Sequence, residues 1–482
     1  MNFAAIFYLL GKLLMIMGAL VLLPAGVAWY YGELVPLQHF VMTAAVAGFL
    51  GLFAMILCRG SRDESLRVRD GFLLVTLAWV LVSLIGAIPF FQSEHFPLFI
   101  DALFEATSGF TTTGASVLSD VEVLSRSLLF WRSFTHWIGG MGIIVLVIAI
   151  LPQLSVGGMQ LIKNEMPGPT FEQLKPRIQQ TALSLWRIYL LFSIAEIICL
   201  WVAGMSFFDS VCHMFGTMGT GGFSTRNASI GAYSTTIQMI ITFFMFLAGT
   251  NFVLHYTNLT GNLKKMFLDA EWRFYVSLLV VFAAVICVDL TVQGNLPVLE
   301  SLRFSIFQVT SITTTTGYAT TDFDTWPYLS KGVLFLLMFV GGCAGSTSGG
   351  LKQMRLLLLF KRAKQSIVQH IFPKAVVTVK VNQRAVPESV LYGVSSFFLI
   401  YIVIFSFCTL PLLAFNIDFI TATSAVVACL SNIGPGFGLV GATQNYAFFP
   451  WLIKLLLCAC MIIGRLEIFT VLVLFFPATW RK

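Results

Sequence analysis

Four short segments that combine Gly with Thr or other small residues recur along the chain at intervals of roughly one hundred residues, as expected of a repeated structural unit. The segments are Phe110–Ala115, Thr217–Phe223, Thr313–Tyr318 and Ser431–Gly436. A ring of backbone carbonyl and hydroxyl oxygens can replace the water shell of a monovalent cation. The pattern therefore predicts an ion pathway in which these four segments, here called the filter loops, surround one axis.

Glycine is expected to carry the backbone geometry of the filter loops. Gly114, Gly221, Gly317 and Gly434 are predicted to let successive carbonyls turn inward, because a Cβ disfavours the required backbone angles. The neighbouring threonines add hydroxyl oxygens and can steady each loop. The predicted cation-binding residues are Thr111, Thr112, Thr113, Gly114, Thr220, Gly221, Gly222, Thr314, Thr315, Thr316, Gly317, Asn432, Ile433 and Gly434.

Close helix packing is the alternative explanation for each Gly-rich segment, since small residues in membrane helices usually serve that purpose. Packing alone does not explain why the segments follow a short helical stretch in four matching places. The second and fourth loops are less regular, with Gly219-Thr220 and Asn432-Ile433 where the others have Thr pairs. This difference predicts fewer coordinating hydroxyls and looser discrimination than in a perfect fourfold ring.

Acidic residues stand near the start of each short helix that precedes a filter loop. They are Asp101 with Glu105, Asp209, Glu300 and Asp418. Taken singly, each is explained by helix N-capping. Acids at the N-terminus would also leave the negative ends of four helix dipoles directed at the axis, as a cation pathway requires.

The composition places these loops in a membrane. The 482 residues are 57% hydrophobic and 11% charged, with a mean hydropathy of +0.87, whereas soluble chains carry about a quarter charged residues. Apolar runs long enough to cross a bilayer recur from end to end. Ala5–Tyr30 is expected to be a retained helix rather than a signal peptide, because it is long and contains Lys12.

The predicted fold is an all-α polytopic membrane protein. Two N-terminal helices precede four pseudo-repeats of helix, re-entrant pore loop and helix around a central ion pore. The expected divisions are 1–70 for the two extra helices and 71–160, 161–262, 263–365 and 366–482 for the four pore repeats. Irregular backbone at membrane depth is tolerated only where protein buries it or where it lines water.

The placement of the basic residues, which give a net charge of +7, indicates topology rather than partner choice. Lys and Arg cluster in alternate loops, whereas the loops that contain the filter segments are poor in them. The positive-inside rule then places the basic loops in the cytoplasm, with the filter loops entering from outside. No nucleic-acid partner is expected. The nine Cys are scattered without a Cys-x-x-Cys pair, which argues against a disulfide framework or a metal site other than one for the transported ion.

The chain resembles the TrkH-type subunits of the Trk/Ktr/HKT superfamily of potassium transporters. The resemblance covers essentially the whole chain, with Ser348 where a further Gly is expected. It rests on Thr111–Gly114, Trp137–Gly142, Met166–Pro169, Gly221–Thr225, Thr314–Gly317, Gly341–Thr347, Asn432–Gly436 and Gly464–Glu467. It implies K⁺ at the filter residues, a homodimer with one pore per protomer, and cytosolic TrkA-type subunits. Nucleotides would bind that partner, so no cofactor is expected in this chain.

Two features are candidates for a gate. Arg465 lies deep within the last apolar run, Trp451–Phe476, where a charge must be paired or face water. It is either a positive barrier under the filter, which the resemblance favours, or part of a structural ion pair. The Gly-rich segment Gly341–Gly350 interrupts a long apolar stretch and is predicted to be a movable intramembrane loop. Its candidate gate residues are Gly345, Ser346, Thr347, Ser348, Gly349 and Gly350.

Potassium uptake across a bacterial inner membrane through a gated, channel-like pore is the expected function. The alternative is a symporter coupled to protons or sodium, which would need several buried acids; Glu196 is the one candidate noted inside an apolar run. An enzyme is not expected, because no converging nucleophile, base or metal-ligand motif is found. A voltage-gated channel would require a helix with regularly spaced Arg, which is also absent from the sequence.

Overall fold

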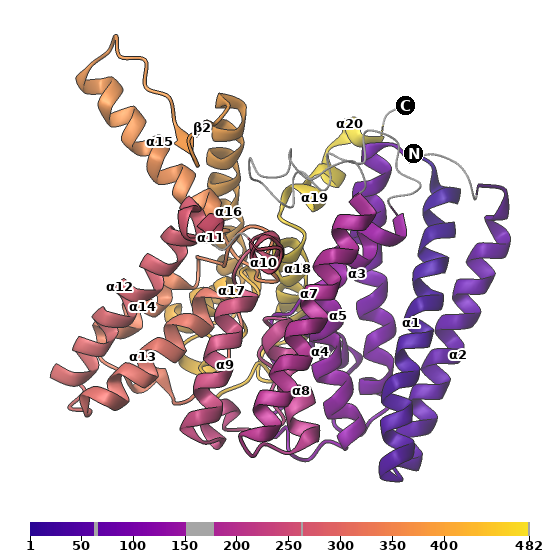
Figure 1. Ribbon diagram of the computed structural model, residues 1–482. Coiled ribbons are helices and arrows are strands. Elements are labelled where there is room, and N and C mark those ends of the chain that lie inside the picture. Colours follow the sequence, from indigo (N-terminus) through magenta and orange to yellow (C-terminus); the bar gives the residue numbers. More distant parts are fainter. Residues whose placement is uncertain (62–65, 151–177, 262–263, 481–482) are drawn as a thin grey trace.

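The computed structural model describes residues 1–482 except 62–65, 151–177, 262–263 and 481–482. The described part is a bundle of long helices with shorter helices inserted between them (Figure 1). The predicted motif Met166–Pro169 lies outside the described residues. The predicted all-helical class is confirmed, apart from a two-stranded hairpin of β1 (Lys380–Val381) and β2 (Arg384–Ala385).

Two N-terminal helices, α1 (Phe3–Tyr31) and α2 (Leu34–Leu57), form a hairpin at the edge of the molecule (indigo in Figure 1). Gly32 closes the turn between them with a φ of 71°. The two helices touch where Gly11 faces Gly51, and a Cβ on either glycine would meet the carbonyl oxygen of the other. Small residues at this crossing thus allow the close packing that is common between membrane helices.

The remainder of the chain repeats one order of elements four times: a long helix, a short helix, a filter loop and a second helix. The long first helices are α3 (Val68–Phe91), α7 (Ile178–Val202), α12 (Ala270–Val292) and α16 (Glu388–Ala414). The short helices, here called pore helices, are α4 (Phe99–Phe110), α8 (Phe207–Met218), α13 (Val298–Thr313) and α17 (Phe419–Leu430). The helices after the filter loops are α5 (Arg126–Ile150), α9 (Thr235–Ala248), α14 (Tyr328–Leu337) and α18 (Trp451–Arg465).

The pore helices are too short to span a bilayer, as predicted. They contain 12, 12, 16 and 12 residues, which corresponds to about 18–24 Å at 1.5 Å per residue. A hydrocarbon core is about 30 Å thick. Each pore helix therefore ends inside the protein, and its filter loop follows at that depth.

Six described helices are long and apolar enough to cross a membrane, or eight if two bent pairs each count as one span. In one pair α9 is followed by α10 (Phe252–Leu259) at 97°, and in the other α18 is followed by α19 (Phe469–Leu472) and η8 (Val473–Phe475) at 110°. The apolar runs 237–256 and Trp451–Phe476 are therefore bent, and neither forms one continuous helix. At the first bend, the Asn251 side chain accepts a 2.8 Å bond from Val253 N and starts a new helix.

The predicted break in the third unit is present. α14 ends at Leu337, and the next helix, α15 (Gln353–Ile371), begins after the intramembrane loop. In the first unit, α5 is continuous through Trp137–Gly142, so glycine there serves close packing: a Cβ on Gly139 would meet the Phe110 carbonyl. The remaining short elements are α11 (Lys264–Leu268), α20 (Pro477–Trp480), η1 (Arg59–Ser61), η5 (Ser229–Ala232), η6 (Phe323–Thr325) and η7 (Gly438–Val440).

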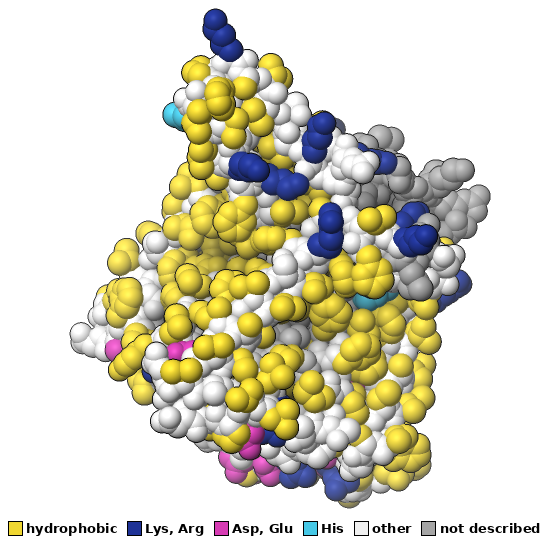
Figure 2. Space-filling model, turned by 60° about the vertical axis from the view of Figure 1, so that its left-hand side comes forward, with side chains coloured by type: hydrophobic (Ala, Val, Ile, Leu, Met, Phe, Trp, Pro, Cys, Tyr) yellow, Lys and Arg dark blue, Asp and Glu magenta, His cyan; other side chains and the backbone are white. Residues whose placement is uncertain are grey.

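Charge is segregated between the two ends of the molecule. In the view of Figure 2, Lys and Arg lie towards the end that carries α15 and the β1–β2 hairpin, whereas Asp and Glu gather with other basic residues at the opposite end. Two basic residues do not fit this description, because Lys352 and Arg355 are buried. Lys352 directly precedes α15 and is buried, so the break between α14 and α15 lies within the protein.

Candidate functional site

The four filter loops share one backbone conformation. In each loop the left-handed region is occupied twice, two residues apart. The first of these residues are Thr112, Thr220, Thr315 and Asn432, with φ between 54° and 57°. The second are Gly114, Gly222, Gly317 and Gly434, with φ between 78° and 99°. Because four separate segments repeat the same unusual sequence of angles, they form one structural motif.

The residue between each pair is anchored to its own pore helix. Its amide donates a bond of 2.8 Å in every unit, to the carbonyl five residues earlier. The bonds are Thr113 N to Ser108 O, Gly221 N to Gly216 O, Thr316 N to Ser311 O and Ile433 N to Ala428 O. The shared anchor fixes how far each loop extends from the C-terminal end of its helix.

The filter loops converge in a closed ring, as predicted. The Cα of each left-handed glycine lies against a carbonyl oxygen of the next unit, so that a Cβ would collide with it. The contacts are Gly114 to Gly221 O, Gly222 to Thr316 O, Gly317 to Ile433 O and Gly434 to Thr113 O. The last contact returns to the first unit, and the four loops therefore surround one axis.

The glycine equivalence predicted for the second loop is wrong by one residue. Gly222, not Gly221, occupies the position of Gly114 and has a φ of 79°. Gly221 matches Thr113, and a Cβ there would meet the imidazole ring of His136. His136 Nδ1 lies 2.8 Å from the Gly109 carbonyl. A packing contact with another helix explains this glycine, which spacing along the chain cannot reveal.

Threonine hydroxyls in the first and third loops bond within the loops. Thr111 Oγ1 donates to Thr107 O at 2.7 Å and lies 2.8 Å from Thr113 Oγ1. The equivalent Thr314 Oγ1 donates to Thr310 O at 2.8 Å and lies 2.8 Å from the Thr316 hydroxyl. These hydroxyls steady the loops, which leaves the backbone carbonyls as the candidate ligands for a cation.

A cavity of about 140 Å³ opens on one side of the ring. All four left-handed glycines line it, together with residues that follow each filter loop, such as Ser116, Asn227 and Thr443. Its volume accommodates several water molecules. This cavity, here called the vestibule, gives a hydrated ion a route to the ring.

A buried ion pair supports the first two loops from behind. Arg132 Nε lies 2.6 Å from Glu105 Oε1, and the two side chains are 4% and 0% exposed. Glu105 also accepts bonds from Ser116 Oγ and Val117 N, whereas Arg132 Nη1 donates to Ser224 O at 3.0 Å. The pair therefore ties the segment after the first filter loop to the segment after the second.

The predicted helix-start acids have different roles. Asp418 caps α17 by accepting a 3.0 Å bond from Thr421 N. Ser206, rather than Asp209, caps α8. Asp101 pairs with Lys454 at 2.6 Å in a buried contact between α4 and α18. Of the acids described here, Asp418 acts as an N-cap. Glu105 lies too far along α4 to cap that helix.

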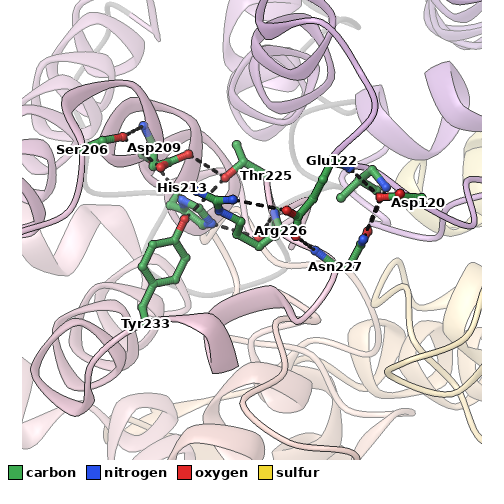
Figure 3. A network of polar contacts seen from close by, with 11 residues as sticks. Asp120, Glu122, Ser206, Asp209, His213, Thr225, Arg226, Asn227 and Tyr233 are labelled. Carbon is green, nitrogen blue, oxygen red and sulfur yellow. Dashed lines mark hydrogen bonds and ion pairs between the residues drawn. The ribbon is translucent and has the colours of Figure 1, made fainter.

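Polar contacts hold together the loops around the vestibule (Figure 3). Asn227 Nδ2 donates to Asp120 at 2.7 Å, and this bond lowers the pKa of Asp120. Arg226 pairs with Glu122 at 3.2 Å, and hydrogen bonds to Tyr233 and Glu122 raise the pKa of Arg226. The outer rim therefore keeps its charges over the physiological pH range.

The same contacts extend inward to the pore helix of the second unit. Thr225 Oγ1 donates to Asp209 at 2.7 Å (Figure 3). His213 Nε2 lies 3.0 Å from Ser224 Oγ. His213 Nδ1 lies 2.8 Å from the Asp209 carbonyl. His213 thus joins its helix to the segment that follows the second filter loop.

The intramembrane loop lies on the other side of the ring. The Gly349 amide donates to Thr315 Oγ1 at 2.7 Å, so the loop touches the third filter segment directly. Cys343 N donates to Gly249 O at 2.9 Å, and Phe252 N donates to Gly345 O at 3.1 Å. The intramembrane loop thus bonds to the break between α9 and α10. The interruption in the second unit therefore lies next to the interruption in the third.

Arg465 joins three of the four units. Its Nη1 donates to Thr347 O at 2.7 Å, and its Nη2 donates to Gly139 O at 2.6 Å. Glu467 pairs with Arg355 rather than with Arg465. Arg465 is buried and lies in the last turn of α18. It therefore connects the intramembrane loop to α5 across the inner side of the ring.

Two charged residues hold the intramembrane loop, and the sequence predicted this role for neither of them. Lys352 Nζ donates to Ser348 O. Glu271, in the first turn of α12, accepts bonds from Ala344 N at 2.6 Å and Met354 N at 3.0 Å through one carboxylate oxygen. Nothing in the sequence marked Glu271 as a contact of the loop, because an acidic residue at the start of a helix is common. It clamps both sides of the segment that contains the candidate gate residues.

The comparisons with known proteins agree with this architecture. The family described as "TrkH: Cation transport protein" matches residues 37–482. Trk system potassium uptake protein TrkH of Salmonella typhimurium is 42% identical over 488 residues, and that of Escherichia coli K12 is 41% identical over 489, with each chain covered completely.

A solved structure gives the same result. The crystal structure of the potassium transporter TrkH from Vibrio parahaemolyticus superposes with a TM-score of 0.90 and 37% identity, and 100% of each chain is covered. Similar sequence over the complete length, the matching fold and the ring of filter loops lead to one conclusion. The chain belongs to the TrkH family of cation transport proteins.

Proposed function

We propose that this protein takes up potassium across a bacterial inner membrane through the ring of filter loops. The closed order of glycine-to-carbonyl contacts is the observation that carries the proposal, because it gathers main-chain oxygens from four units around one axis. Relatives of 42% and 41% identity are named potassium uptake proteins. The chain itself serves as a transporter subunit and needs no cofactor for this role.

Carbonyl oxygens are the proposed K⁺ ligands. The residues between the left-handed pairs, namely Thr113, Gly221, Thr316 and Ile433, present carbonyls to the glycine of the preceding unit. Such a ring substitutes for the hydration shell of the ion, while the helix dipoles add negative potential. Because Gly221 and Ile433 lack the hydroxyls of their counterparts, the loops of the second and fourth units have less internal support.

A gate is proposed on the inner side of the ring. The intramembrane loop, with Gly345 to Gly350 as its moving part, and Arg465 together obstruct the path from the filter to the cytoplasm. A buried guanidinium repels a cation that approaches it in a medium of low dielectric constant. For flux to occur, the loop must leave Thr315 and Arg465 must move with it.

The partner assignments are proposals from the resemblance. Two protomers would form a homodimer, and cytosolic TrkA-type subunits would bind nucleotides and control the gate. The basic segments Lys163–Arg187 and Lys352–Arg384 are the proposed docking surfaces. Residues up to 177 of the first lie outside the described part, and Lys352 and Arg355 of the second are buried, so the proposed surface of the second begins beyond them. The pore repeats would follow the predicted divisions 71–160, 161–262, 263–365 and 366–482.

Symport is the alternative function, coupled to protons or sodium. Glu196 is fully buried in α7, and such an acid favours this alternative to a limited degree. Rubidium uptake into proteoliposomes distinguishes the two functions. Uptake that follows the rubidium gradient alone supports a pore, whereas a strict requirement for a proton or sodium gradient supports symport.

Gly114→Ser tests the filter assignment in the same assay. A serine Cβ would collide with Gly221 O at a φ of 82°, so we expect the ratio of sodium to rubidium uptake to rise about tenfold, as for a loss of about 1.4 kcal/mol in discrimination. Gly332→Ser is the matched control, because a Cβ there meets no atom within 4 Å. Unchanged selectivity in Gly114→Ser would remove this glycine from the filter.

A further inference from the structure

One hydrogen bond joins the intramembrane loop to the filter. The Gly349 amide donates to the Thr315 hydroxyl at 2.7 Å, and both groups are buried. Gly349 is held closely on two further sides. A Cβ there would meet Ser431 O and the Asn432 side chain of the fourth filter loop, and the Gly349 carbonyl lies against Gly341. The loop therefore fits beneath the ring at this residue.

Thr315 differs from its three counterparts in this contact. Thr112 Oγ1 is buried and has no hydrogen-bond partner among the described residues. Thr220 Oγ1 donates to Gly219 O, and the Asn432 amide donates to Thr113 Oγ1 and Met461 O. In the described part of the chain, Thr315 alone of the four accepts a bond from the intramembrane loop.

We propose that this bond couples the position of the intramembrane loop to potassium occupancy of the filter, an inference that rests on the proposed function. An N–H group that donates to Thr315 directs the positive end of its dipole towards the inner side of the ring. A cation bound there and the closed loop then disfavour each other. Because coupling between two equilibria is reciprocal, potassium must favour release of the loop by the same factor.

The hydrogen bond that carries the proposed coupling involves the third unit only. Thr315 has a left-handed backbone with a φ of 56°, as does Thr112 with 55°. Two threonines in the same conformation thus differ in whether the loop contacts them. This difference provides a matched pair, since valine retains the shape and β-branching of threonine but cannot accept a hydrogen bond.

The experiment measures exposure of the loop as a function of potassium. Ser346→Cys is introduced into the full-length protein, and its labelling by a thiol reagent is compared in K⁺ and in N-methylglucamine. The protein that retains Ser346 measures the background labelling of the native cysteines. We expect K⁺ to increase labelling about fivefold, the effect of one ordinary hydrogen bond. Thr315→Val should abolish the dependence, and Thr112→Val should retain it.

Several results would overturn the coupling. The first is labelling of Ser346→Cys that does not depend on K⁺ when the filter residues are unaltered. The second is a K⁺ dependence that Thr315→Val leaves unchanged. The third is an equal loss of the K⁺ dependence in Thr315→Val and Thr112→Val. If Thr315→Val does not yield monodisperse protein, Thr315→Ser decides, because it keeps the acceptor and must keep the dependence. Rubidium flux in the same preparation separates the hypotheses: flux without K⁺-dependent labelling removes the coupling alone, and absence of flux removes the proposed function.

Discussion

Glycine serves two separate purposes in the filter loops. Gly222 has a φ of 79° and lies against the carbonyl of Thr316, so both its backbone and its surroundings exclude a side chain. Gly221 adopts no left-handed angle and is small because His136 fills the adjacent space. Adjacent glycines can therefore be required for unrelated reasons, one conformational and one steric.

Arg465 is predicted to limit flux. Replacing it with Ala removes the donor groups that bond Thr347 O and Gly139 O and also removes a buried positive charge from the path. We expect rubidium flux to rise on the order of tenfold, equivalent to about 1.4 kcal/mol of barrier. Arg465→Lys keeps the charge and should give a smaller rise. Unchanged or slower flux in Arg465→Ala would indicate a structural role instead.

The buried pair of Glu105 and Arg132 is predicted to dominate stability around the filter. Glu105→Gln leaves Arg132 without its counter-charge and should cost about 3 kcal/mol. Glu122→Gln is the control, because its pair with Arg226 is 42% and 47% exposed and should contribute less than about 1 kcal/mol. Thermal unfolding in detergent measures both, and equal losses would contradict the assignment.

At the level of elements, interrupted helices gather on the inner side of the ring. The breaks after α9, α14 and α18 contribute Gly249, the intramembrane loop and Arg465, respectively. Their free backbone groups bond to one another, as in Cys343 N to Gly249 O. Irregular backbone at this depth is stable because neighbouring breaks satisfy its polar groups. The first unit differs, because its α5 is continuous.

Glu271 is predicted to define the moving part of the intramembrane loop. Its carboxylate binds Ala344 N and Met354 N, so residues between them can move while both ends stay fixed. Each lost hydrogen bond should reduce the stability of the closed loop by about 1 kcal/mol. Glu271→Ala should therefore release the ends of the loop and raise basal rubidium flux severalfold. Glu271→Gln retains an acceptor oxygen and should remain close to the wild type. Wild-type flux in Glu271→Ala would place the hinge elsewhere.

For the whole molecule, the segregation of charge predicts its orientation. Val376, beyond α15, is 93% exposed, and Tyr328, at the start of α14, is 88% exposed. A cysteine in place of Val376 should react with an impermeant reagent only from the cytoplasmic side, and one in place of Tyr328 only from outside. Labelling of whole cells and inverted vesicles measures this. The reverse result would invert the proposed direction of the pore.

The sequence predicted the repeated architecture because that depends on local properties: apolar length, short helices and Gly-rich loops. Contacts between units were not predictable in the same way. Arg132 reaches Glu105 and Ser224 from a different helix, and Glu271 contacts a loop that lies more than seventy residues later in the chain. The bend after Gly249 was missed because one Gly-Thr-Asn stretch barely lowers the hydrophobicity of its span.

The ring of filter loops also has a rotational sense. Each glycine lies against the unit that follows it in the chain, and the fourth lies against the first. A bulky side chain on one of these glycines should therefore displace the carbonyl oxygen of the following unit only. At position 114 it displaces an oxygen of the second unit, and at position 434 it displaces an oxygen of the first. The free-energy effects of substitutions at glycines of adjacent units should consequently be non-additive. Those of substitutions at glycines of opposite units should be more nearly additive.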